Sequence, residues 1–268
     1  MMDWLWKRWN RQQKRYRLSA AGRCDIGKVR SNNEDNLYFG GQILPQEHQR
    51  TEQSLMETVW TVPQAVYGVF DGMGGEENGE VASFLAAQAL KQAYMKQKLS
   101  GTALLEHAVQ EMNAQVAAEA DKVHGRVGTT SVMLEFQEDQ LICCNVGDSR
   151  AYRLRNGVLS QLSTDHNDAE FLRRQGVTRR RPRLTQYIGL DPQELRICPS
   201  WFQDTVSAGD QYLLCSDGLT DMLSDDEIGV LLQESGTSED SVELLVHEAL
   251  KQGGCDNITV IVVTVQEE

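Results

Sequence analysis

The sequence has no long apolar run, no paired-cysteine motif and only five histidines, and each shortage narrows what the chain can be. No stretch approaches the roughly 20 apolar residues that a membrane-spanning helix needs. The start of the chain also lacks the apolar segment of a secretory signal. The six cysteines include no C-x-x-C pair, which favours reduced core thiols in a cytoplasmic protein. The absence of a histidine cluster argues against zinc.

Charge is unevenly distributed along the 268 residues, whose formal net charge is −13. Six lysines and arginines lie in residues 1–18, where Asp3 is the only acid, so the remainder of the chain is strongly acidic. An acidic body argues against nucleic-acid binding and is compatible with binding cations.

The first 18 residues differ in texture from the rest. Trp4, Trp6 and Trp9 alternate with basic residues, a pattern that would suit peripheral contact with an anionic membrane or with a partner protein. We favour a third interpretation, an arm that packs on the domain. No repeat or flexible linker divides the rest, so we predict an N-terminal arm over residues 1–18 and one domain over residues 19–268.

Apolar patterning predicts clustered strands and paired helices. The expected strands are Asn36–Phe39, Ala65–Phe70, Ser131–Phe136, Gln140–Val146, Arg150–Arg155, Gln211–Cys215 and Ile258–Val265. The expected helices are Asn78–Leu99, Thr102–Val123, Asp225–Glu234 and Ser238–Gln252. Short connections between strands indicate antiparallel neighbours. The pattern predicts an α+β domain in which helix pairs cover antiparallel sheet.

Four aspartates follow strand-like runs in short, glycine-flanked turns: Asp71, Asp148, Asp217 and Asp256. A carboxylate at the end of a buried strand is costly unless positive charge meets it. We therefore expect the four to converge on a shared cation, and hard oxygen ligands favour Mg²⁺ or Mn²⁺. Two alternatives stay open, because Asp71 could cap the following helix and Asp148 could pair with Arg150.

A second acidic motif, RSNNED (30–35), comes directly before the expected strand Asn36–Phe39. Glu34 and Asp35 are adjacent and would face opposite ways on a strand, so one could bind a metal while the other holds water or a loop. Arg30 offers a planar fork that suits phosphate oxygens.

Taken in order, the motifs resemble one family. They are CDIGKVRSNNEDN (24–36), VFDGMGG (69–75), VGTTSV (127–132), NVGDSRAYRL (145–154), LSTDHN (162–167), IGL (188–190), LCSDGL (214–219) and GGCDNITVIV (253–262). Together they resemble the metal-dependent serine/threonine protein phosphatases of type 2C (PPM), and the compact length and DGMGG resemble the bacterial branch.

The resemblance implies a four-layer αββα sandwich, two mainly antiparallel sheets flanked by helix pairs, with the metal site at one edge. It implies that Asp71 bridges two Mn²⁺ or Mg²⁺ ions and that the Gly72 carbonyl joins one of them. Asp217 and Asp256 would bind mainly the other ion, and Glu34 and Asp35 would act directly or through water. Asp148, with Asp217, would reach a third, weaker ion, and Arg30 would hold the substrate phosphate.

The implied activity is hydrolysis of phosphoserine and phosphothreonine on proteins by a water that the paired metals activate, opposing a bacterial serine/threonine kinase. A monomer is the expected state. Met73 stands where eukaryotic relatives often carry a histidine acid, so the proton donor would be a metal-bound water near Asp148, or His166. The arginines between residues 167 and 187 lie in a stretch that forms a flap in relatives and could attract acidic peptides. The alternatives are a phosphoprotein-binding pseudophosphatase and a metallohydrolase of small phosphomonoesters.

Overall fold

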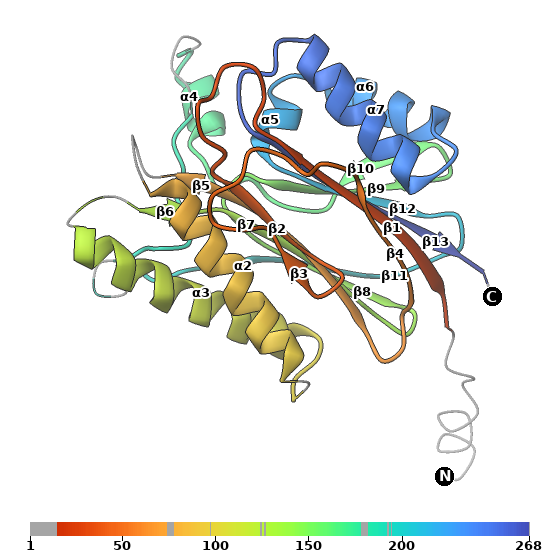
Figure 1. The fold of residues 1–268 in the computed structure, drawn as a ribbon, viewed down its shortest axis with the longest axis horizontal. Coiled ribbons are helices and arrows are strands. Elements are labelled where there is room, and N and C mark those ends of the chain that lie inside the picture. The colour runs from red at the N-terminus through yellow and green to blue at the C-terminus, as the bar shows by residue number, and fades with distance from the viewer. Residues whose placement is uncertain are drawn as a thin grey trace.

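The computed structural model describes residues 15–73, 78–96, 98–123, 125, 127–177, 182–191, 193 and 195–267. Two antiparallel sheets face each other, and a pair of long helices covers the outer face of each (Figure 1). This is the predicted α+β, four-layer αββα sandwich.

The first sheet has six strands. Their spatial order is β10 (Val158–Gln161), β9 (Arg150–Arg155), β12 (Gln211–Cys215), β13 (Ile258–Gln266), β1 (Arg17–Asp25) and β4 (Leu55–Trp60). Every neighbouring pair is antiparallel. The two longest strands of this sheet, β1 and β13, pair along their full length and lie between β12 and the edge strand β4.

The second sheet has seven strands. The order is β11 (Ser200–Thr205), β8 (Gln140–Val146), β7 (Ser131–Gln137), β5 (Ala65–Met73), β2 (Asp35–Phe39) and β3 (Gln42–Ile43). The short strand β6 (Gly128–Thr129) pairs with the end of β5, at Gly72 and Met73.

Helices close both outer faces. α2 (Gly79–Met95) and α3 (Thr102–Val123) pack on the seven-stranded sheet, and α6 (Asp225–Glu234) and α7 (Ser238–Lys251) pack on the six-stranded sheet. Two short helices, α4 (Ala169–Arg174) and α5 (Asp217–Thr220), lie in connections. No helix in the described ranges is long and apolar enough to cross a bilayer.

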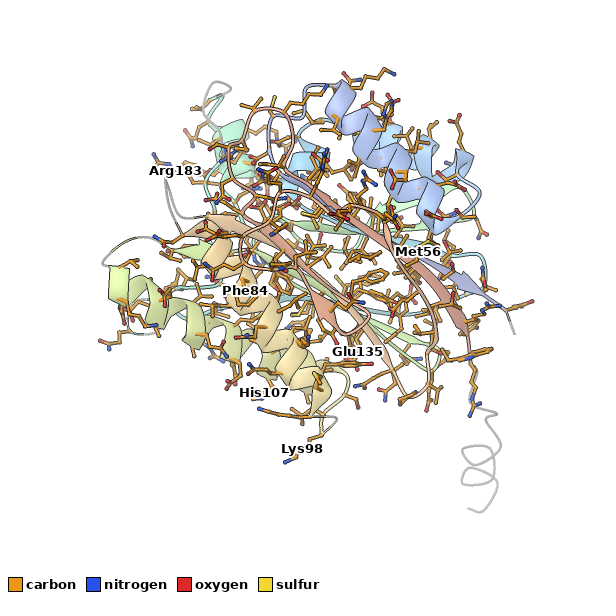
Figure 2. The ribbon with its side chains drawn as sticks, in the orientation of Figure 1. Met56, Phe84, Lys98, His107, Glu135 and Arg183 are labelled. Atoms are coloured by element: carbon orange, nitrogen blue, oxygen red, sulfur yellow. The ribbon has the colours of Figure 1, made fainter. Side chains whose placement is uncertain are left out.

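Side chains fill the space between the sheets (Figure 2). Tyr67, Phe136 and Tyr212 form a chain of edge-to-face rings, with centroids 6.0 Å and 5.3 Å apart. Such aromatic pairs add about 0.5–1.5 kcal/mol beyond the burial of their area. The rings connect the two sheets through the core, since Tyr67 and Phe136 belong to the seven-stranded sheet and Tyr212 to the six-stranded sheet.

All the strands and long helices that the sequence predicts are present. Their bounds match the predicted ones to within about a residue, except for β5 and α2. β5 extends through Asp71 to Met73, and α2 ends at Met95. β1 begins at Arg17, so the last two residues of the predicted 1–18 arm are paired in the sheet. Residues 1–14 of that arm lie outside the described residues, and the division into arm and domain stays a prediction.

Candidate metal and phosphate site

The predicted acidic residues come from both sheets and reach the same end of the sandwich. Asp35 and Asp71 are direct partners in the pairing of β2 with β5. Asp217 begins α5 directly after β12, Asp256 precedes β13, and Asp148 lies between β8 and β9. Asp71 is within β5 and α2 begins only at Gly79 with Asn78 as its N-cap, so the capping alternative for Asp71 is excluded.

Electrostatics shows that these carboxyl groups act on one another. Burial raises the pKa of Asp71 well above its usual range, and four other carboxylates raise it further: Asp217, Asp35, Asp148 and Asp256. Burial also raises the pKa of Asp35 to about 7, although hydrogen bonds from Thr259 and Ser216 oppose the shift. An ionised carboxylate so crowded by like charge needs a cation nearby.

Within the described ranges, no set of three or more Asp, Glu, His or Cys side chains is drawn together tightly enough to hold an ion as it stands. The carboxyl groups therefore influence one another's pKa without forming a closed cage of ligands. The chemistry of the set still fits a hard divalent cation, because it consists of carboxylate and backbone oxygens.

The backbone of Asp71 is pinned by a neighbouring strand end. Its N–H donates to Thr130 Oγ1 (3.1 Å), and its carbonyl accepts from Thr130 N (2.8 Å) and from Thr129 Oγ1 (2.9 Å). Thr130 Oγ1 is in turn 2.6 Å from Ser149 Oγ, next to Asp148. These threonines connect the end of β5 to the β8–β9 connection, and neither is among the site residues predicted from the sequence.

Gly72 occupies a position that tolerates no side chain. Its N–H donates to the Glu34 carbonyl (3.1 Å), and an added Cβ would lie 2.2 Å from the Gly79 carbonyl oxygen. Burial raises the pKa of Glu34, opposed by the nearby Arg30 guanidinium and by a hydrogen bond from the Gly79 backbone. Glu34 therefore rests against the start of α2, where an acidic group is favoured by the helix dipole.

Asp35 and Glu34 face different neighbours, as the sequence predicts for adjacent residues at a strand. Asp35 is almost fully buried and accepts a hydrogen bond from Ser216 Oγ (2.7 Å), directly before Asp217. Asp35 thus links the seven-stranded sheet to the six-stranded sheet at the site.

Arg30 forms an ion pair with one of the candidate ligands. Arg30 Nη2 lies 2.7 Å from Asp256 Oδ2, and the Arg30 side chain keeps 41% of its surface exposed. Asp256 raises the pKa of this guanidinium against the opposing effect of burial, so Arg30 stays charged. A charged, accessible fork beside the carboxylates can meet a phosphate oxygen.

Asn257 is the most connected residue that sequence reasoning undervalued, since it suggested only a turn. Its amide oxygen accepts from Glu34 N (2.8 Å), and its amide nitrogen donates to the carbonyls of Ile26 (2.9 Å) and Asn32 (3.0 Å). A Cβ on Gly218 would lie 1.9 Å from the Asn257 carbonyl oxygen, so α5 packs directly on this turn. The contact brings Asp217 and Asp256 to the same place.

The sequence left two partners open for Asp148, a shared cation and Arg150. Arg150 makes its close ion pair with Asp165 instead. Arg150 Nη2 is 2.7 Å from Asp165 Oδ2, and Nε is 3.0 Å from Asp165 Oδ1. Asp148 instead accepts from Asn167 Nδ2 (3.3 Å), and burial raises its pKa. Asp148 therefore remains available to a cation.

His166 has both ring nitrogens engaged. Gly147 N donates to Nδ1 (3.2 Å), which places the proton on Nε2, and Nε2 lies 2.8 Å from Ser200 Oγ. Burial also lowers the pKa of His166. A neutral ring held by two hydrogen bonds fits a structural role rather than that of a general acid.

The basic stretch after His166 is partly described. Arg173 and Arg174 end α4, where Arg174 pairs with Glu170, and Arg183 N donates to Asp168 Oδ1 (2.7 Å). Arg179, Arg180 and Arg181 lie outside the described residues. The role of these arginines as a flap that recruits substrates stays a prediction.

Comparisons with known proteins agree with this architecture. The family model described as Protein phosphatase 2C matches residues 39–171. "Serine/threonine phosphatase stp" of Listeria monocytogenes is 32% identical over 258 residues, covering 92% of this chain and 95% of the relative.

Among solved structures, the Mycobacterium tuberculosis serine/threonine phosphatase PstP/Ppp superposes with a TM-score of 0.77 at 31% identity, covering 94% of this chain and 100% of the other. The catalytic domain of PstP in complex with 2 manganese ions superposes with a TM-score of 0.74 at 32% identity over the same shares. The chain belongs to the protein phosphatase 2C family.

Proposed function

We propose that this chain is a metal-dependent phosphoprotein phosphatase that hydrolyses phosphoserine and phosphothreonine. The observation that carries the proposal is that carboxylates from both sheets converge on Asp71. Each of these carboxylates raises the pKa of Asp71. Family membership and the relatives named serine/threonine phosphatases support the same activity. The natural substrates are phosphorylated proteins, and the enzyme reverses the action of a serine/threonine kinase.

The residues fit two divalent ions, Mn²⁺ or Mg²⁺, as in the PstP complex with 2 manganese ions. Asp71 and the Gly72 carbonyl would hold them together with Asp217 and Asp256, and Glu34 and Asp35 would contribute directly or through water. Asp148 would hold a third, weaker ion. Bound cations of this kind neutralise the phosphate charge and acidify a coordinated water.

The protein's own groups orient the reaction. Arg30 lies beside Asp256 with its guanidinium accessible, so it can bind the phosphoryl oxygens and offset charge that develops on them. Asn257 and Ser216 keep the RSNNED segment and Asp35 in register with Asp256 and Asp217. Met73 has no proton to give and His166 is committed to Ser200, so the leaving oxygen takes its proton from water.

A metal titration of phosphothreonine-peptide hydrolysis tests the proposal. We expect the full chain to be inactive in excess chelator and to recover when Mn²⁺ is added, whereas Asp71→Asn stays inactive at every concentration. Wild-type turnover that survives the chelator would contradict the proposal. Phosphopeptides and small phosphomonoesters should be compared in the same assay, and a preference for small metabolites would reassign the substrate class.

A further inference from the structure

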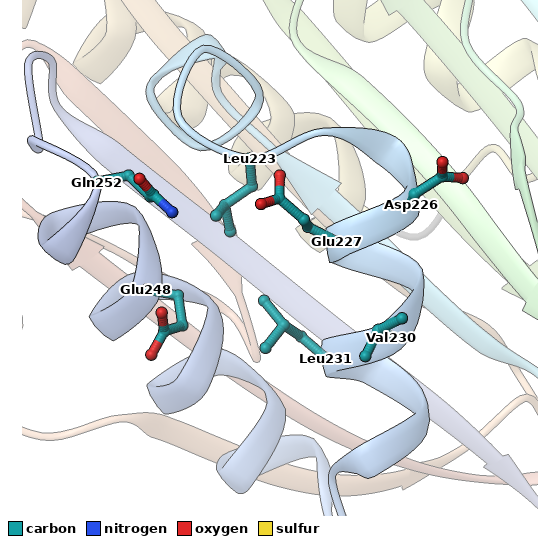
Figure 3. A pocket seen from close by; sticks show the side chains of 7 residues that line it. All are labelled: Leu223, Asp226, Glu227, Val230, Leu231, Glu248 and Gln252. Atoms are coloured by element: carbon teal, nitrogen blue, oxygen red, sulfur yellow. The ribbon is translucent and has the colours of Figure 1, made fainter.

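Two hollows with acidic lining lie along the helix pair α6 and α7, and neither is lined by a candidate metal ligand. The first, of about 280 Å³, has an apolar floor of Leu223 and Leu231, and Val230 lies at its edge on the same side of α6 as Asp226 (Figure 3). Its rim carries Asp226, Glu227 and Glu248.

A second hollow of about 550 Å³ continues along the same helix pair. Leu244 lines it together with Glu234, Asp240 and Glu243. We call the two hollows together the α6–α7 groove.

The negative charge of this groove is largely uncompensated. Residues 221–254 contain nine acidic residues and one base, Lys251. Glu243 pairs with Arg23 and Glu248 with Lys251, but within the described part of the chain no lysine or arginine pairs with Asp226 or Glu234. Val230 lies between them and is 51% exposed. An acidic rim around exposed apolar side chains suits a basic segment that carries large apolar residues.

Such a segment precedes β1 in this chain. Residues 1–14 hold Trp4, Leu5, Trp6 and Trp9 together with four lysines and arginines. We propose that residues 1–14 bind in the α6–α7 groove of the same molecule, with the tryptophans on its apolar floor and the basic residues at its acidic rim.

The connection makes this docking geometrically accessible. Ser238 Oγ, at the start of α7, donates to the Ser19 carbonyl (2.8 Å), so the chain enters β1 beside the end of the groove lined by Asp240 and Glu243. Fourteen extended residues span up to about 46–50 Å. The 14 residues of α7 span about 21 Å. The segment can therefore reach along the whole groove.

Charge favours the groove over a lipid surface. The six acidic residues that line the α6–α7 groove would oppose the approach of an anionic membrane, whereas they would attract the basic side chains of residues 1–14. A tether of this length also gives a high effective concentration, on the order of millimolar, so modest contacts are enough.

Tryptophan fluorescence of the full chain tests the proposal. In a Trp60→Phe/Trp201→Phe background, only Trp4, Trp6 and Trp9 emit. We expect acrylamide to quench this emission several times less than that of a synthetic peptide of residues 1–18. The groove variant Asp226→Lys/Glu234→Lys/Glu248→Lys should bring quenching to the level of the peptide.

The matched control reverses three exposed acids on α3 and has the same charge change: Glu106→Lys/Glu111→Lys/Asp121→Lys. It should leave the shielding intact. Wild-type quenching equal to that of the peptide, or equal loss of shielding in both variants, would overturn the proposal.

Two further measurements identify the occupant. Shielding that disappears on dilution, with dimers seen by light scattering, would assign the contact to a second copy and overturn docking within one molecule. With vesicles of equimolar phosphatidylcholine and phosphatidylserine, the groove variant should sediment more than the α3 control, which has the same charge change, because only the groove variant releases its N-terminal segment. Equal sedimentation of these two variants would overturn the proposal, and strong sedimentation of the wild type itself would assign the segment to a membrane contact.

Discussion

At the scale of single residues, the site depends as much on neutral side chains as on the acids. Asn257 is almost fully buried and makes three hydrogen bonds that join Asp256 to the segment before Glu34. Removing one partner of a buried hydrogen bond leaves the others unsatisfied, at a cost of about 1–3 kcal/mol. Asn257 thus positions two candidate metal ligands, Asp256 and Glu34, without being one itself.

Asn257→Ala should lower both stability and activity. We expect a loss of about 1–3 kcal/mol in the free energy of unfolding, measured with urea, because Glu34 N and two carbonyls lose their partner. The value of kcat/KM for a phosphothreonine peptide should fall at least tenfold, and excess Mn²⁺ should restore part of it.

Asn113→Ala is the matched control, because Asn113 accepts from Gly189 N (2.7 Å) and donates to the Leu190 carbonyl (3.0 Å), and neither bond goes to a segment that carries a candidate metal ligand. It should destabilise similarly and spare kcat/KM at a temperature where both variants are folded. Equal activity of the two variants would show that Asn257 does not position the site.

At the scale of elements, close backbone contacts decide where the strand ends meet. α5 approaches the start of β13 so closely that residue 218 has to be glycine. In α6, by contrast, a Cβ on Gly229 would meet Leu159 at 3.5 Å, an ordinary contact distance. The fold therefore requires glycine at position 218 but has room for a larger residue at position 229.

Alanine at these two positions should change stability in opposite directions. Gly229→Ala should stabilise the protein by about 0.5–1 kcal/mol, because glycine inside a helix costs backbone entropy. Gly218→Ala should destabilise it by about 1–3 kcal/mol through overpacking and should abolish phosphatase activity by separating Asp217 from Asp256. Thermal unfolding measures both effects, and an active, stable Gly218→Ala variant would contradict the packing described here.

At the scale of the whole molecule, the acidic end of the sandwich is a source of instability that cations would relieve. The folded-state pKa of Asp35, about 7, lies above its usual value near 3.9. The folded state therefore binds more protons than the unfolded state between about pH 4 and pH 7, and this group's contribution to stability is lost as the pH rises through that window. A cation held by these carboxylates would take the place of the proton.

In excess chelator, the free energy of unfolding should thus contain a component that falls from about pH 4 to pH 7, and Asp35→Asn should remove it. At pH 7, Mn²⁺ at a hundredfold excess over its dissociation constant should stabilise the wild type by about 2.7 kcal/mol. Asp71→Asn should be more stable than the wild type in chelator and gain much less from Mn²⁺. If Mn²⁺ did not shift the urea unfolding midpoint of the wild type, the metal assignment would be wrong.

Several elements were predictable from local pattern because their burial follows a regular period. The helices Thr102–Val123 and Asp225–Glu234 match α3 and α6 in their bounds, since one face of each is apolar. β1 escaped prediction although it is central, because Ala20, Ala21 and Gly22 carry little strand preference. Only its pairing with β13 and β4 makes it a strand.

The edge strands β4 and β11 were also missed. Their residues alternate between half-buried and exposed, so short alternating segments such as Leu55–Trp60 give a weak signal. Their place is set by the neighbouring strand.

The sequence by itself indicated the chemical character of the site, because four carboxylates at the ends of buried strands are costly unless positive charge meets them. The tertiary structure alone decided which partner each group takes. In the fold, Arg150 forms an ion pair with Asp165 and His166 a hydrogen bond with Ser200. Asp256 forms an ion pair with Arg30. The physical reason is that side-chain chemistry is local, whereas hydrogen bonds and ion pairs depend on distances between segments that only the packed sheets bring together.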